Sequence, residues 1–328
     1  MKNFYTDLAL EMAETLNTAD GESIPGVEIT RAEDDEVKIT AIRITNDDGA
    51  KQMGKPIGNY ITIESAALRM ADISTHERII GLLAKHLAEL CEGFSKENTL
   101  VVGLGNENVT PDALGPKVVG KTLVTRHIME ALPEELHGGV MPVCAIAPSV
   151  MGLTGIETAE IVRGLAEHVR PGMIIAIDAL AARSVSRINA TIQITDTGIS
   201  PGAGMGSGRM PLNAETMGVP VIAIGVPTVV DAATLSNDTI DLMIESMQSN
   251  YHPDLANGGA FFDTLKSLQE CEKYQAIKDI LAPFDGNMFV TPKEIGEVVN
   301  WLANIISNGI NLSLHPGLDR EDINRFTY

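Results

Sequence analysis

Cysteine, long apolar runs and positive charge are all scarce in this chain of 328 residues. Its cysteines, Cys91, Cys144 and Cys271, are odd in number and far apart, which argues against a disulfide framework and favours a reducing compartment. No stretch approaches the ~20 apolar residues that a membrane-spanning helix needs, and the polar N-terminus lacks the apolar core of a secretory signal. We therefore expect a cytoplasmic protein without a membrane partner.

Acidic side chains outnumber basic ones by 44 to 24, so the formal net charge is −20. Such a charge repels nucleic-acid phosphates and anionic membrane surfaces, so we expect no direct binding of nucleic acid. The sequence contains no CxxC, HExxH or Cys/His cluster, and its histidines are scattered, so we expect neither a dedicated metal site nor a cofactor. With 44% hydrophobic residues, the chain has ample material for a buried core.

From residue 100 onward, short apolar runs alternate with helical stretches, which is typical of an α/β fold with a mostly parallel sheet buried on both faces. The expected strands are 100–104, 140–146, 173–177, 188–194 and 219–226. We expect residues 8–328 to form a single domain.

Two regions flank this alternating pattern. Residues 25–70 contain apolar/polar alternation around an Asp47–Gly49 turn, which predicts a small antiparallel β region near the N-terminus. Ser74–Glu77 matches a capping box and opens an amphipathic helix. Residues 230–328 are expected to be mainly helical, with one helix beginning at Thr228 and a late helix from 292 to 306.

Asp112 follows a buried strand and a Gly-rich loop, in the segment Val101–Pro116. Thr110 and Pro111 predict an N-cap and a first helical position, so Asp112 should lie in the first turn of a helix at the carboxyl edge of the sheet. Ligands bind at that edge in open α/β sheets. The helix dipole should keep Asp112 ionised. A role limited to capping the helix fits the same residues.

Asp178 ends the apolar run 173–177 and is followed by small apolar residues. Burial of a lone carboxylate is unfavourable, so it needs a partner, a proton or a chemical role. One alternative is a purely structural aspartate that accepts hydrogen bonds from loop N–H groups or pairs with Arg183. The other is that Asp112 and Asp178 share a proton, so that one activates water while the other donates to a substrate carbonyl.

The segment Thr195–Arg209 is rich in glycine but matches neither a P-loop nor a dinucleotide-binding fingerprint. It predicts either a mobile flap bordering the crevice, with Gly202, Gly204 and Gly206 against the substrate backbone, or a plain connection.

Three blocks of sequence resemble the spore germination protease family. They are Val101–Pro116, Ile177–Ser184 and Asp196–Gly204, and their order and spacing agree with the family as well. The resemblance covers residues ~5–235 well, and the C-terminal third matches more loosely.

The resemblance implies an endopeptidase that begins the degradation of small acid-soluble, DNA-protecting spore proteins during germination, in the forespore or spore core. It also implies a homotetrameric, self-processing zymogen and a three-layer α/β fold similar to that of the hydrogenase-maturation proteases. The family's two catalytic aspartates fall on Asp112 and Asp178. A metal-dependent peptidase on the same scaffold, or a non-catalytic scaffold protein, are the alternatives.

The resemblance also implies a preferred cleavage site, with an acidic residue before the cut, an apolar residue after it and then alanine. The bond between Asp7 and Leu8 fits this preference. Residues 1–7 would then be a short propeptide. The same Thr6–Asp7 pair could simply cap a first helix that begins near Leu8 and runs to Leu16.

Overall fold

The computed structural model describes residues 6–20, 24–95, 98–133, 135, 137–201, 209–250, 270–281 and 288–326. Its strands are β1 (Val27–Asp34), β2 (Val37–Ile44), β3 (Gly58–Glu64), β4 (Thr99–Gly103), β5 (Val143–Ile146), β6 (Met173–Ala182), β7 (Thr191–Thr195), β8 (Val221–Asp231) and β9 (Phe289–Val290). Its α-helices are α1 (Ala9–Asp20), α2 (Asp47–Met53), α3 (Ile73–Leu90), α4 (Leu114–Val119), α5 (Arg126–Met129), α6 (Met151–Thr154), α7 (Thr158–Val169), α8 (Ala214–Met217), α9 (Ala232–Asn250), α11 (Glu270–Leu281), α12 (Ile295–Leu314) and α13 (Arg320–Phe326). The 3₁₀ turns are η1 (Ala66–Arg69), η2 (Thr110–Asp112) and η4 (Val185–Arg187).

The strands form one sheet in the order β1-β2-β3-β7-β8-β6-β4-β5, with β9 paired to the end of β8. Strands β5, β4, β6 and β8 are mutually parallel, whereas β1, β2, β3 and β7 join by antiparallel pairing. Most strands therefore point one way, with β2, β7 and β9 reversed. This confirms the α/β class, and the antiparallel region near the N-terminus extends the same sheet.

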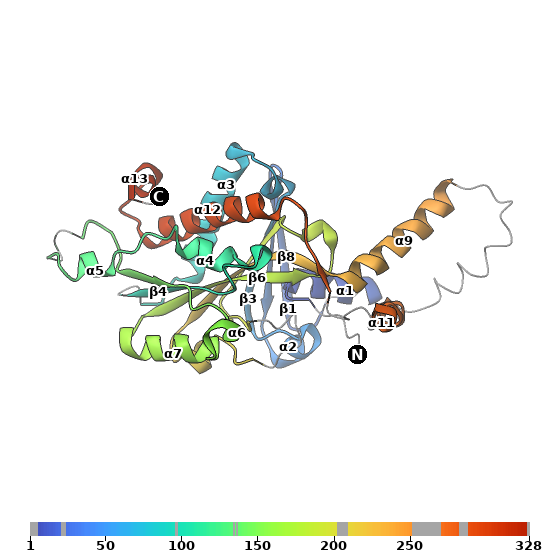
Figure 1. Ribbon diagram of the computed structural model, residues 1–328, viewed down its shortest axis with the longest axis horizontal. Helices are drawn as coiled ribbons and strands as arrows, with labels where there is room; N and C mark the ends of the chain where they lie inside the picture. The colour runs from blue at the N-terminus through green and yellow to red at the C-terminus, as the bar shows by residue number, and fades with distance from the viewer. Residues whose placement is uncertain are drawn as a thin grey trace.

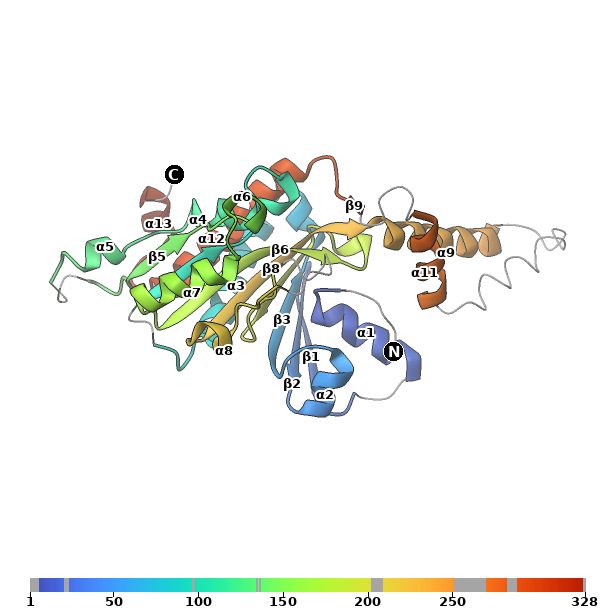
Figure 2. The same cartoon turned by 60° about the horizontal axis from the view of Figure 1, so that its bottom comes forward.

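Helices cover both faces of the sheet and make three layers (Figure 1). On one face lie α3, α4 and α12, which pack on the central strands. The opposite face carries α7 and α8 over the parallel strands, and α1 and α2 over β2 and β3 (Figure 2). The N-terminal segment thus lies on the α7 side of the sheet.

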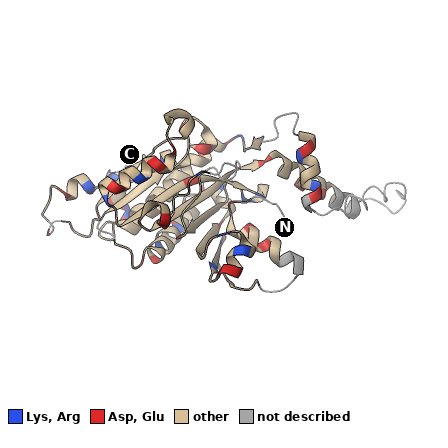
Figure 3. Cartoon of the chain, turned by 90° about the horizontal axis from the view of Figure 1, so that it is seen from below, with Lys and Arg blue, Asp and Glu red and all other residues tan. Residues whose placement is uncertain are grey.

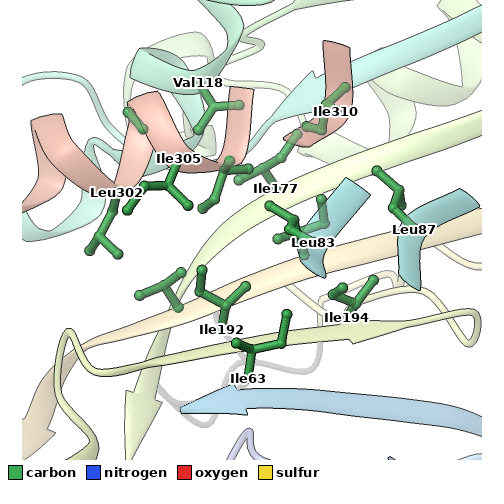
Figure 4. Close-up of a cluster of buried hydrophobic side chains, with 14 of the residues drawn as sticks. Ile63, Leu83, Leu87, Val118, Ile177, Ile192, Ile194, Leu302, Ile305 and Ile310 are labelled. Carbon is green, nitrogen blue, oxygen red and sulfur yellow. The ribbon is translucent and has the colours of Figure 1, made fainter. Parts of the chain in front are cut away.

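The largest buried cluster fills the space between the sheet and the α3–α12 layer (Figure 4). Leu83 and Leu87 of α3 and Leu302 of α12 lie over isoleucines of the central strands. Each fully buried aliphatic side chain contributes roughly 1.5–3 kcal/mol. Charged residues, by contrast, lie on the helices, the loops and the edge strand β1, whereas β4, β5 and β7 contain none (Figure 3). Among the described residues, no helix has the length and apolarity that crossing a membrane would need.

The structure confirms the expected strands and corrects several boundaries. Residues 47–53 form α2 rather than a turn, because the Asn46 side chain caps the helix by accepting from the Gly49 N–H at 2.9 Å. Helix α3 is capped by Asp72 and not by Ser74, since the Asp72 carboxylate accepts from two backbone N–H groups of the first turn. No helix begins at Thr228, because β8 continues to Asp231.

Candidate functional site

Asp112 is placed by a close approach between β4 and α4. Gly103 ends β4, and a Cβ there would lie 2.2 Å from the carbonyl oxygen of Gly115 in α4. Gly105 has a positive φ of 106°, and a Cβ there would lie 2.1 Å from the Asp112 carbonyl oxygen. The backbone N–H of Asn106 donates to the Asp112 carboxylate at 2.7 Å. Glycine at these positions therefore lets the loop fold back tightly and present Asp112 at the sheet edge.

Asp178 lies within β6 and is only 6% exposed. Strands β4 and β6 are parallel neighbours, and Gly103 pairs with Ile177, the residue before Asp178. The Ala179 N–H donates to the Asp178 carboxylate at 2.9 Å. The expectation that Asp178 ends its strand is wrong, because β6 continues past it to Ala182. Asp178 instead lies where the neighbouring strand β4 stops, near enough to Asp112 for that charge to affect its pKa.

The two carboxyl groups differ in environment. Burial, followed by the negative charge of Asp112, raises the pKa of Asp178 well above its ordinary value. Burial also raises the pKa of Asp112, although the Asn106 N–H and the positive charge of Arg209 oppose the shift. Asp178 is therefore the group that retains a proton, and Asp112 is the better candidate for the ionised partner.

One expectation about Asp112 is wrong. The residue before its turn is Val109, which offers no side-chain cap, and Asp112 lies in the short 3₁₀ turn η2 rather than in an α-helix. The pKa of Asp112 is raised, because burial outweighs the opposing effects of the Asn106 N–H and the positive charge of Arg209. Sequence reasoning also gave no role to Arg209, whose charge acts on both carboxyl groups. The one feature of the sequence that could have indicated this role is the position of Arg209 at the end of a Gly-rich loop.

The N-terminal segment lies against the same strands. The Asp7 carboxylate accepts from the Ala181 N–H of β6 at 3.0 Å, and its charge is among those that raise the pKa of Asp178. Leu8 is fully buried. The Thr6 hydroxyl accepts from the Leu8 N–H at 3.1 Å. Thr6 therefore caps the backbone just before α1, whatever else this segment does.

An ion network fastens α1 to the end of β6. Glu11, 2% exposed, accepts from the backbone N–H groups of Arg183 and Ser184 at 2.9 and 3.0 Å. Arg187 lies 3.5 Å from the Glu11 carboxylate and 2.7 Å from that of Glu14. These contacts hold the segment before α1 over the sheet.

A cavity of about 440 Å³ opens beside this segment, and its walls include Asp7, Lys55, Tyr60, Gln193 and Asn213. Gly202, Gly204 and Gly206 lie outside the described residues, while the ends of their loop are joined by mutual backbone hydrogen bonds of Ile199 and Leu212 at 2.9 and 2.8 Å. Within the described ranges, no three His, Cys, Asp or Glu side chains gather as a metal site would require.

Comparison with known proteins defines the class to which this fold and site belong. The chain is 48% identical to a germination protease from Clostridium tetani, with 98% of both chains covered. It is 45% identical to one from Caldanaerobacter subterraneus subsp. tengcongensis over 98% of both chains, and 41% identical to one from Bacillus cytotoxicus over 98% of this chain and 96% of the relative. These relatives are all proteases by name.

The sequence also matches the germination protease family of peptidases over residues 6–252 and 245–327. The chain belongs to the germination protease family. Among solved structures, the nickel–iron hydrogenase maturation protease HycI from Thermococcus kodakarensis KOD1 aligns with 44% of this chain and 80% of its own, at 18% identity and a TM-score of 0.29. The assignment to the α/β class therefore depends on the strand order and directions described above and not on this alignment.

Proposed function

We propose that this germination protease hydrolyses peptide bonds with Asp112 and Asp178 acting as a pair. The observation that carries the proposal is that both carboxyl groups lie beyond the end of β4, with pKa values raised to different extents. Two neighbouring carboxyl groups with separated pKa values can divide the work of base and acid. A purely structural pair would gain little from such unfavourable burial.

In the proposed reaction, the Asp112 carboxylate takes a proton from water as the water oxygen bonds to the substrate carbonyl carbon. The carbonyl electron pair moves onto its oxygen. When the C–N bond breaks, the nitrogen takes a proton from the Asp178 carboxyl and the carbonyl re-forms. One water is consumed, and the products are a carboxylic acid, which ionises, and an amine. The proton gained by Asp112 then passes to Asp178 and restores the pair for the next cycle.

We further propose that the chain processes itself between Asp7 and Leu8 and so removes residues 1–7. The Asp7 side chain is bonded to β6 three residues beyond Asp178, which supports placing this bond near the pair. Wild type should produce a chain that begins at Leu8, detected by intact mass and N-terminal sequencing. The Asp178→Asn variant should not. The same cut in the variant would assign the cleavage to a contaminant.

Family membership supports small acid-soluble spore proteins as substrates, a spore-core location and a homotetramer as parts of the proposal. Sedimentation of the purified chain tests the tetramer. Cleavage of a small acid-soluble spore protein after exhaustive chelation tests the metal-dependent alternative, in which the two aspartates would be oxygen ligands. We expect the cleavage to survive. Loss on chelation, with recovery when a divalent ion is restored, would replace the aspartate-pair mechanism.

A further inference from the structure

The carbonyl oxygen of Asp7 belongs to the bond proposed to be cut, and two side-chain donors converge on it. Lys55 donates through Nζ at 2.9 Å, and Gln193 donates through Nε2 at 3.3 Å. Lys55 also donates to the Thr6 carbonyl at 3.2 Å. The sequence pattern gave no indication of either residue, because one follows α2 and the other lies in β7, far from both aspartates in the chain.

The sheet places Gln193 and Asp178 in one row. Each pairs with Gly225 of the intervening strand β8, so their side chains project from the same face. Two strand spacings separate their backbones by about 10 Å. The Gln193 Oε1 accepts from the Ala9 N–H at 2.7 Å, while Asp7 reaches β6 at Ala181. The segment therefore spans from β7 to β6, with the Asp7 carbonyl between these attachments.

Lys55 is aimed at this carbonyl by the end of α2. Gly54 caps the helix in the left-handed conformation, with φ of 59°, and turns the chain toward the N-terminal segment. Burial lowers the pKa of Lys55, although Asp7 and Glu11 counter the shift. Lys55 is half-buried, and a donor partly withdrawn from water interacts more strongly with a developing negative charge than one in solvent.

We propose that Lys55 and Gln193 stabilise the negative charge that forms on the carbonyl oxygen of the bond being cut, first in the chain's own Asp7–Leu8 bond and then in substrates. This proposal rests on the proposed function. When water adds to the carbonyl carbon, its oxygen becomes an oxyanion, and hydrogen bonds to an oxyanion are shorter and stronger than those to a neutral carbonyl. Lys55 and Gln193 then favour the transition state over the bound peptide.

The test compares variants of the full chain by the first-order rate at which a chain beginning at Leu8 appears. Removing one oxyanion donor lowers rates by roughly 10²–10³-fold, so Lys55→Met should slow processing by about 10²-fold, and Lys55→Arg should recover part of the loss. Gln193→Glu retains an acceptor for the Ala9 N–H but loses the donor, so it should also slow processing. Lys51→Met, on the exposed side of α2, is the matched control and should process normally.

A second measurement separates stabilisation of the oxyanion from simple fastening of the segment. Hydrogen exchange of residues 8–13 is compared with and without Lys55→Met in the inactive Asp178→Asn background. We expect equal protection, because the Glu11 network and the buried face of α1 remain. Processing at the wild-type rate in Lys55→Met would overturn the proposal. A loss of protection that parallels the loss of rate would also overturn the proposal, because Lys55 would then only hold the N-terminal segment in place.

Cleavage of an added peptide containing Asp-Leu-Ala distinguishes failure of this proposal from failure of self-processing. If wild type cuts the peptide but not its own Asp7–Leu8 bond, self-processing is wrong. Lys55→Met should still lower kcat for the peptide by about 10²-fold with little change in KM. An unchanged kcat would refute the role of Lys55, whatever the chain does to itself.

Discussion

Replacing Asp178 with asparagine should separate what this side chain contributes to chemistry from what it does to stability. Asparagine has nearly the same shape and can still accept from the Ala179 N–H, but it cannot hold or transfer the acidic proton. An acid or base in the reacting pair typically contributes ~10²–10⁴-fold to the rate. We therefore expect peptide cleavage to fall by that factor.

The same substitution should raise stability at neutral pH. Burial and Asp112 raise the pKa of Asp178 in the folded chain above 3.8, the value for an unperturbed aspartate. As the pH rises past that value, the unfolded chain releases a proton that the folded chain retains, so Asp178 increasingly favours unfolding. Each unit by which the pKa is raised corresponds to about 1.4 kcal/mol. Asparagine lacks this penalty, so its advantage should shrink as the pH falls toward 4.

Urea unfolding followed by circular dichroism, at pH 4.5 and pH 7.5, measures the effect, and cleavage of a peptide containing Asp-Leu-Ala measures activity. Asp196 is the matched control because it also follows a buried strand, and it accepts from the Asn59 N–H and Nδ2 at 2.8 and 2.6 Å. Asp196→Asn should lose stability and keep cleavage. The reasoning is refuted if Asp178→Asn cleaves normally, or if it is less stable than wild type at pH 7.5.

Three further outcomes follow from contacts in the structure. Arg187→Met should lower the free energy of unfolding by roughly 1–3 kcal/mol, because it removes the guanidinium that lies 3.5 Å from the buried Glu11 carboxylate; a urea midpoint close to wild type would contradict this. Gly103→Ala should reduce both stability and cleavage by pushing α4 and Asp112 away from β4, whereas Gly120→Ala, whose nearest atom is 3.6 Å away, should do neither. Peptide cleavage should be unchanged after dialysis against a chelator. A loss of cleavage that only added metal restores would contradict that expectation.

Much of the sheet could be predicted because buried parallel strands have a local signature. The apolar runs at 173–177 and 219–226 identify β6 and β8 without any knowledge of their partners. Helix α3 is equally visible from its apolar spacing. The ends of the helices were less predictable. The cap of α3 and the start of α2 depend on which of several nearby polar side chains accepts hydrogen bonds from the backbone N–H groups of the first turn.

Asp112 and Asp178 could be singled out from the sequence because each follows an apolar run, although β6 in fact continues past Asp178 to Ala182. Their titration could not be predicted. The raised pKa of Asp112 depends on how far its own carboxyl group is buried. The raised pKa of Asp178 depends first on burial and then on the charges of Asp112 and Asp7, which the charge of Arg209 opposes. These charges come from separate segments of the chain.

By itself, then, the sequence determined the α/β class and the family and pointed to Asp112 and Asp178 as candidates, because each of these is encoded in runs of adjacent residues. Only the tertiary structure decided that Lys55 and Gln193 meet at the Asp7 carbonyl. Gln193 comes from β7 and Lys55 from the turn after α2, whereas the carbonyl belongs to the N-terminal segment, and no local pattern relates them. Strand order and the docking of α1 bring them within hydrogen-bond distance, which is a property of packing and not of any stretch of sequence.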